Sequence, residues 1–441
     1  RLMKTVSYLP NGMILLPGLD KELSSNNWES ITPSHPQFTL KTLLKRLSIK
    51  RSNVKTWPTA LCFNHNSSRS KMLSEALKPP KTNNAIPNFQ LDHDAIKNIT
   101  IVECADTREE AGLIALRMRA ALDEISTSGN KAKSGRLKNR RLKTIALITA
   151  DRQLAHQVAV ELTKWNITVD DSAGKPINQT LEGSLLQLTS KFFIKDLGTV
   201  DLLAALKHPL ASGGIIPEKF REFTQEFEAC YLRKVQPISG FFALKNLPTD
   251  YFPDKEMQLW TKGIFNILKT CSDILVSEKE DFFKILCTHI RASEWLASNY
   301  DSDGSNLLFG SIAGKELALF LEELLEHGDS IGKINGTDYI SIFNSLIKQH
   351  MIRPKFENQN NFFIWSPLEA RLQKSDIVII GGLNEGTWPL KPKNDPWMNR
   401  PMREAFGLAS PEKRIGLSAH DFVQAASTEQ VMITRSQKNN D

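Results

Sequence analysis

The chain has 441 residues, of which 41% are hydrophobic and 24% are charged, and these fractions are typical of an ordinary globular protein. At about 150 residues per domain, this length allows two or three domains. The sequence has no apolar run of the roughly 18 residues that a membrane-spanning helix requires, and its start does not read as a signal peptide. We therefore expect a protein with no membrane partner.

The net charge is +7, which permits a polyanionic partner but does not identify one. The five cysteines are dispersed and include no C-x-x-C pair. This usage predicts reduced thiols in a cytoplasmic protein, with no metal site in the chain. The chain begins at Arg1 and not at Met, so we interpret it as part of a longer protein.

The first element is an apolar strand expected at residues 13–16, followed by a turn that carries Asp20. A carboxylate after an apolar strand is the arrangement of a Walker B element, in which it holds Mg²⁺. A buried strand followed by a plain turn explains the same residues, and it is the favoured interpretation of this pattern alone. Residues 79–97 are rich in Pro and Asn and indicate a linker.

A strand is expected at residues 99–105, because the segment is dominated by β-branched side chains. The following helix opens with the capping-box pattern Thr107-x-x-Glu110. Seven basic residues then lie between Lys131 and Lys143, including Lys138, Arg140 and Arg141. They predict a solvated loop or, alternatively, a contact with a phosphate backbone.

Residues 144–171 read as strand, helix and strand, with Asp151 as the helix N-cap, which predicts a parallel sheet. Residues 197–355 show helical periodicity almost throughout, most clearly at 257–276, 281–297, 315–327 and 339–350. Strand patterns return at 362–365, 376–380 and 430–434. The sequence thus predicts an α/β sheet interrupted by an all-helical segment.

The strand expected at 376–380 leads into a glycine-rich loop, Gly381-Gly382-Leu383-Asn384-Glu385-Gly386. Open α/β sheets bind ligands at this end of their strands, where Glu385 is placed to contact a ribose or a basic partner. A tight turn with a structural glutamate is the alternative. The last strand ends at Arg435, which fits either an arginine that stabilises charge on a γ-phosphate or a surface ion pair.

Taken in order, these segments resemble the second motor lobe of UvrD-type superfamily 1 helicases. The run Gly382–Pro389 is similar to the loop after their motif V, and Gln430–Ser436 is similar to their motif VI, which ends in Thr-Arg-Ala. The helical segment is similar to the insertion in that lobe. A closer resemblance is to the B subunits of AddAB helicase–nucleases. The segments that carry it are residues 16–20, 35–37, 69–79, 169–174, 365–373, 395–403 and 414–422.

This resemblance implies RecA-like parallel-sheet lobes divided as residues 1–97, 98–196, 197–355 and 356–441, the third being the helical insertion. It implies a subunit of an ATP- and Mg²⁺-dependent enzyme that processes double-strand DNA ends with an AddA partner. The resemblance places four residues near the nucleotide: Asp20, Arg69, Glu369 and Glu385. Arg69 resembles the arginine of motif IV. The resemblance gives Arg435 the catalytic role. The nuclease and its iron–sulfur cluster would lie beyond Asp441.

The sequence departs from the family pattern at several motifs. It contains no G-x-x-x-x-G-K-[ST], Asp20 is followed by Lys21, and motif V is reduced to Leu368-Glu369. A second hypothesis is therefore a non-catalytic scaffold that scans single-stranded DNA with an inactive motor. A third, an unrelated α/β domain for a nucleotide or a sugar, requires the ordered matches to be coincidental.

Overall fold

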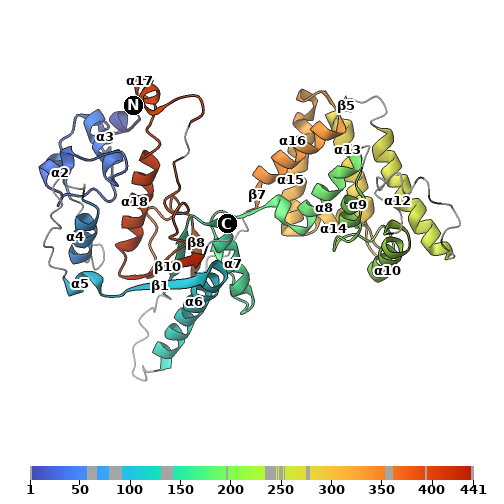
Figure 1. The fold of residues 1–441 in the computed structure, drawn as a ribbon, viewed down its shortest axis with the longest axis horizontal. Helices are drawn as coiled ribbons and strands as arrows, with labels where there is room; N and C mark the ends of the chain where they lie inside the picture. The colour runs from blue at the N-terminus through green and yellow to red at the C-terminus, as the bar shows by residue number, and fades with distance from the viewer. Residues whose placement is uncertain are drawn as a thin grey trace. The chain divides into compact units, whose positions relative to one another are not determined.

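The computed structural model of the protein describes residues 2–56, 67–78, 92–130, 143–194, 197–233, 245, 247, 252, 254–274, 279–352, 361–392 and 395–438. The chain forms two compact units (Figure 1). The first consists of Arg1–Ser172 and Phe356–Asp441, and the second of Ala173–Lys355. The two parts of the first unit are thus separated in sequence by the whole of the second.

A six-stranded sheet is the centre of the first unit, with strand order β1-β10-β9-β2-β8-β3 and every neighbouring pair parallel. The predicted α/β class with a parallel sheet is therefore confirmed. The strands are β1 (Ile99–Asp106), β2 (Ile145–Thr149), β3 (Asp170–Asp171), β8 (Phe362–Trp365), β9 (Ile377–Gly381) and β10 (Gln430–Lys438). The helices are α1 (Leu2–Ser7), α2 (Ser25–Glu29), α3 (Phe38–Leu47), α4 (Ser67–Ala76), α5 (His93–Ile96), α6 (Thr107–Asn130), α7 (Arg152–Thr163), α17 (Arg400–Ala405) and α18 (Lys413–Ala426).

Helices cover both faces of this sheet, which explains why its central strands are apolar without alternation. On one face α6 and α7 pack on Leu147, Ile364 and Ile379. On the other, α18 and Leu73 of α4 pack on Ile148 and Ile380. All five residues of β2 and all five of β9 are buried. A fully buried Ile or Leu stabilises the fold by roughly 1.5–3 kcal/mol, so these two strands anchor the unit.

The apolar residues 13–16 do not form the expected strand. They lie in a segment without regular secondary structure, and Met13 and Leu15 are 64% and 60% exposed. Leu16 of this run and the nearby Leu19 instead pack on a small separate core around Trp28 and Leu44. The Walker B interpretation of Asp20 depended on this strand, and the structure does not contain it.

The second unit is almost entirely helical, as the periodicity predicted. Its helices are α8 (Leu181–Thr189), α9 (Thr199–Leu206), α10 (Pro217–Phe227), α12 (Lys255–Asp273), α13 (Phe282–Ala297), α14 (Gly304–Phe309), α15 (Ile312–His327) and α16 (Gly336–Gln349). Two short antiparallel ladders join β4 (Lys175–Pro176) to β7 (Met351–Ile352) and β5 (Glu280–Asp281) to β6 (Lys333–Ile334). The unit begins at Ala173 and not at residue 197, because Ile177, Leu185 and Leu186 belong to its core.

A buried histidine is the centre of the polar contacts in this helical core. His289 Nε2 lies 2.8 Å from the carbonyl oxygen of Leu186, and Nδ1 lies 2.7 Å from the hydroxyl of Tyr339. A carbonyl only accepts, so Nε2 carries the proton and Nδ1 accepts from Tyr339. Burial lowers the pKa of His289 to about 4, which keeps the ring neutral.

Candidate functional site: the carboxyl edge of the sheet

The carboxyl ends of β1, β2, β9 and β10 meet at one edge of the sheet, because all four strands are parallel. Three of these strands lead there into residues with polar chemistry or special backbone conformation. Asp106 ends β1 and Thr107 follows it, Asp151 follows β2, and Gly382 follows β9 with φ of +71°. Ligands of open α/β sheets bind at this edge.

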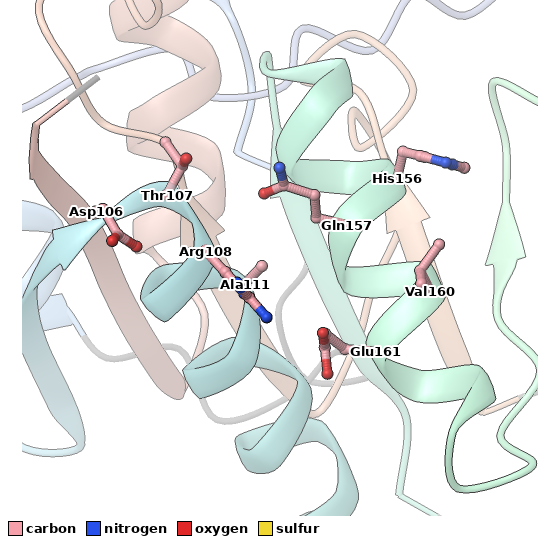
Figure 2. Close-up of a pocket in the computed structure, with 8 residues that line it drawn as sticks. All are labelled: Asp106, Thr107, Arg108, Ala111, His156, Gln157, Val160 and Glu161. Carbon is pink, nitrogen blue, oxygen red and sulfur yellow. The ribbon is translucent and has the colours of Figure 1, made fainter. Parts of the chain in front are cut away.

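Two neighbouring hollows open at this edge. The larger, of about 450 Å³, lies between the first turns of α6 and the body of α7 (Figure 2). It is lined by Asp106, Thr107, Arg108, Ala111, His156, Gln157, Val160 and Glu161. The smaller, of about 270 Å³, shares Thr107 and Gln157 with it and extends to Asp151, Gly386 and Thr387. Basic and acidic groups are mixed in this lining, so it does not form an anion site by charge alone.

Aspartate side chains already occupy the N termini of both helices at this edge. Asp106 Oδ1 accepts a 2.8 Å hydrogen bond from the backbone N–H of Glu109. Asp151 Oδ1 accepts bonds of 2.8 and 3.2 Å from Gln153 and Leu154. A helix N terminus attracts anions, and here a carboxylate stands where the phosphate of a nucleotide would bind. The cap of α6 is Asp106, whereas the sequence pattern predicted Thr107.

Glu110, expected in the capping box, has a different role. Its side chain is fully buried, and Oε1 accepts hydrogen bonds from the backbone N–H of Gly382 at 2.9 Å and from Thr434 Oγ1 at 2.6 Å. Its other oxygen, Oε2, is buried and has no hydrogen-bond partner in the structure. This carboxylate joins α6, the loop after β9 and strand β10. The local pattern Thr107-x-x-Glu110 did not indicate these contacts with distant residues.

The loop after β9 has the predicted glycine-rich turn, and it is tied to β10. Asn384 Nδ2 donates to Ser436 Oγ at 2.7 Å, and Ser436 N donates to Asn384 Oδ1 at 3.2 Å. Trp388 is buried, and its indole N–H donates to the carbonyl oxygen of Ser418 in α18 at 3.2 Å. Glu385 lies between these anchors with its side chain exposed. Its predicted contact with a nucleotide stays a prediction.

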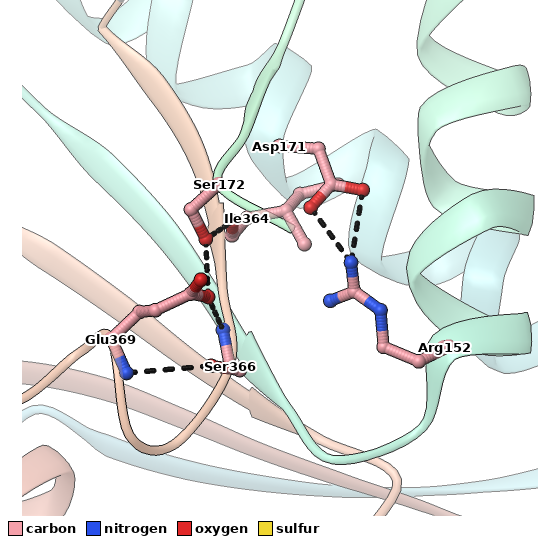
Figure 3. A network of polar contacts seen from close by, with 6 residues as sticks. All are labelled: Arg152, Asp171, Ser172, Ile364, Ser366 and Glu369. Atoms are coloured by element: carbon pink, nitrogen blue, oxygen red, sulfur yellow. Dashed lines mark hydrogen bonds and ion pairs between the residues drawn. The ribbon is translucent and has the colours of Figure 1, made fainter. Parts of the chain in front are cut away.

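Glu369 lies in a polar network at the ends of β3 and β8 (Figure 3). Its Oε2 accepts from Ser172 Oγ at 2.6 Å and from the backbone N–H of Ser366 at 3.1 Å. Burial opposes ionisation of Glu369, but these hydrogen bonds outweigh it and lower the pKa. In the same network Arg152 Nη2 lies 3.0 Å from Asp171 Oδ1. Glu369 thus holds the β8 turn against the end of β3.

Arg435 lies on the opposite face of β10 from Thr434 and is paired with Glu103 on the neighbouring strand β1. The side chains of Arg435 and Glu103 are 59% and 42% exposed. A pair this exposed stabilises a fold by about 0–1 kcal/mol. Arg435 is therefore accessible, but it does not line either hollow at the carboxyl edge.

Arg69 and Asp20 are both engaged in holding the fold. Arg69 is 1% exposed and donates to the carbonyl oxygens of Ala95, Lys97, Thr428 and Glu429, at the amino ends of β1 and β10. This position is at the opposite end of the strands from the carboxyl edge, and the nucleotide contact predicted for Arg69 stays a prediction. The Asp20 carboxylate accepts from the N–H groups of Glu22 and Leu23 and from the Ser74 hydroxyl.

Lys138, Arg140 and Arg141, predicted to contact DNA, lie outside the described residues. In the part of the chain that is described, no group of three or more His, Cys, Asp and Glu side chains is arranged to hold a metal ion. Also within that part, no helix combines the length and the apolar character needed to cross a membrane.

Comparison with known proteins places few constraints on this site. No family model matches the sequence. The chain is 25% identical over 301 residues to an uncharacterized protein of Rickettsia bellii (strain RML369-C). That alignment covers 67% of this chain and 32% of the relative, so it spans about a third of the length of that protein.

Proposed function

We propose that this chain is the helicase-like part of an enzyme complex that processes double-strand DNA ends for recombinational repair. The observation that carries the proposal is the placement of three motif-like segments on strands of one parallel sheet, in which β10 and β9 are neighbours and β2 separates β9 from β8. Glu369 follows β8, the Gly382 loop follows β9, and Arg435 lies in β10. The helical unit inserted between β3 and β8 adds support, because UvrD-type second motor lobes carry such an insertion.

Within such a complex, we propose that this chain handles single-stranded DNA and does not hydrolyse ATP. The residues present do not fit a Mg²⁺–ATP site. Asp20 is engaged with backbone N–H groups, Asp106 and Asp151 occupy the helix N termini, and the sequence has no phosphate-binding G-x-x-x-x-G-K-[ST] loop. Hydrolysis would then belong to an AddA-type partner subunit.

An ATPase assay with and without single-stranded DNA tests this division of roles. We expect no DNA-stimulated hydrolysis by the chain and no effect of Arg435→Ala. The matched control is Arg233→Ala, which removes an exposed arginine paired with Glu228 in the helical unit. Hydrolysis that depends on DNA and is abolished by Arg435→Ala, but not by the control, would show a working motor and refute the scaffold role.

A further inference from the structure

The segment between β9 and α18 exposes an unusual amount of apolar side chain. Trp397 is 86% exposed and Phe406 is 71% exposed. The other described tryptophans are buried or half-buried, with Trp28, Trp260, Trp365 and Trp388 at 9% or less. Met402 and Leu408, at 46% and 45%, add to the exposed apolar surface of the same segment. Several exposed apolar side chains within one short segment favour a binding surface there.

Although it is exposed, Trp397 is held in place by a compact set of hydrogen bonds. Asp395 Oδ1 accepts from the backbone N–H of Trp397 at 2.9 Å and of Met398 at 3.3 Å, and Oδ2 pairs with Arg403 Nη1 at 2.5 Å. The Trp397 N–H, with the other two donors, lowers the pKa of Asp395 and keeps this clamp ionised. These bonds fix the backbone at Trp397, so less backbone conformational entropy is lost when the exposed ring binds a partner.

The same segment is basic. Residues 391–414 contain six Lys and Arg and three Asp and Glu, a net charge of +3. Asp395 pairs with Arg403, and Glu412 pairs with Arg400 at 2.6 Å, so two acids and two bases offset each other and four bases and one acid remain. The segment also leaves the sheet at its carboxyl edge, directly after the Gly382 loop. Along the sequence, its aromatic residues Trp397 and Phe406 therefore alternate with basic residues.

We propose that Trp397 stacks on an unpaired base of single-stranded DNA, while the basic residues of this segment contact the phosphates. This inference rests on the proposed DNA-handling function and assigns a contact residue to it. Proteins that bind single strands combine a basic surface with aromatic rings, and stacking tolerates any base because every base has a π-face. The positive charge of the segment favours single-stranded DNA as the ligand, because an apolar pocket on a partner protein would make no use of that charge.

The test measures the affinity of the 441-residue chain for a fluorescein-labelled 20-nucleotide strand by anisotropy. The variants are Trp397→Ala, Trp397→Leu and Trp397→Phe, and Tyr300→Ala is the control for an exposed aromatic of the helical unit, at 77% exposure. Stacking predicts that the Ala and Leu variants bind about 5- to 150-fold more weakly, while the Phe variant retains most of the affinity. The salt dependence should not change, because Trp carries no charge.

A strand of the same length with abasic sites identifies stacking directly. It keeps the phosphates and lacks the bases, so wild type and Trp397→Ala should bind it equally. If wild type binds the normal strand and Trp397→Ala binds it as tightly, the inference is wrong and the proposed function stands. Full retention by Trp397→Leu would also overturn it, since Leu cannot stack. If wild type binds no single strand at all, the proposed function itself fails.

Discussion

The carboxylate of Glu110 in the first turn of α6 accepts a 2.6 Å hydrogen bond from the hydroxyl of Thr434, a residue 324 positions later in the chain. The same oxygen accepts from the backbone N–H of Gly382. This contact ties the helix after β1 to the loop after β9 and to β10, which carry two of the three motif-like segments. The geometry of the carboxyl edge therefore depends on a side chain that belongs to none of those segments.

Replacement of Glu110 tests this dependence. Glu110→Ala leaves the Gly382 N–H and the Thr434 hydroxyl buried without an acceptor, so we expect a loss of about 2–4 kcal/mol in the free energy of unfolding. Glu110→Gln keeps one acceptor oxygen and should cost about 1 kcal/mol. Urea denaturation followed by circular dichroism measures both, and an alanine variant as stable as wild type would contradict the role.

Arg69 is predicted to be a structural residue of the first unit. Arg69→Met removes the donors to four carbonyl oxygens at the amino ends of β1 and β10, so we expect a loss of about 3–5 kcal/mol. Arg69→Lys should recover little, because an ammonium group cannot reproduce the fixed fork of a guanidinium. Hydrogen exchange of the β1 and β10 amides reports the loss locally. Unchanged protection in both variants would be inconsistent with this assignment.

The stability of the helical unit should depend on pH through His289. Its folded pKa of about 4 lies below the ordinary histidine value of 6.5, so between these values the unfolded chain binds a proton that the folded chain does not. Stability is therefore full above about pH 6.5 and falls by about 3 kcal/mol as pH drops to about 4. Thermal unfolding across this range measures the effect.

His289→Gln should remove this part of the pH dependence, although the variant is less stable at neutral pH because the Tyr339 hydroxyl loses its acceptor. His327→Gln, at an exposed position of the same unit, is the matched control and should leave the profile unchanged. A profile that is the same in wild type and His289→Gln would contradict the account of the buried ring.

The sequence predicted the secondary structure best where local signals agree. The strands at 145–149 and 377–381 are continuous β-branched or apolar runs, and Asp151 caps α7 as its position before an apolar helix indicated. The parallel sheet followed from the strand–helix–strand order. The apolar run at 13–16 failed as a strand because a strand requires pairing from elsewhere, which local composition does not reveal.

The candidate site was harder to predict, since its contacts connect distant parts of the chain. Glu110 fits a local capping pattern, yet its acceptor oxygen serves donors 272 and 324 residues away. Arg69 was placed near nucleotide by resemblance, whereas its carbonyl partners at Thr428 and Glu429 lie 359 and 360 residues away. The sequence around a single glutamate or arginine does not indicate which distant residues its side chain contacts.

The affinity for single-stranded DNA as a function of salt tests the central claim most directly. A DNA-handling lobe should bind a single strand of arbitrary sequence. Its affinity should fall steeply between about 50 and 200 mM salt, because lysines and arginines replace the counterions of several phosphates. The measurement uses the 441-residue chain without ATP. Binding that is absent at low salt, or that does not change with salt, would contradict the proposal that this chain handles DNA.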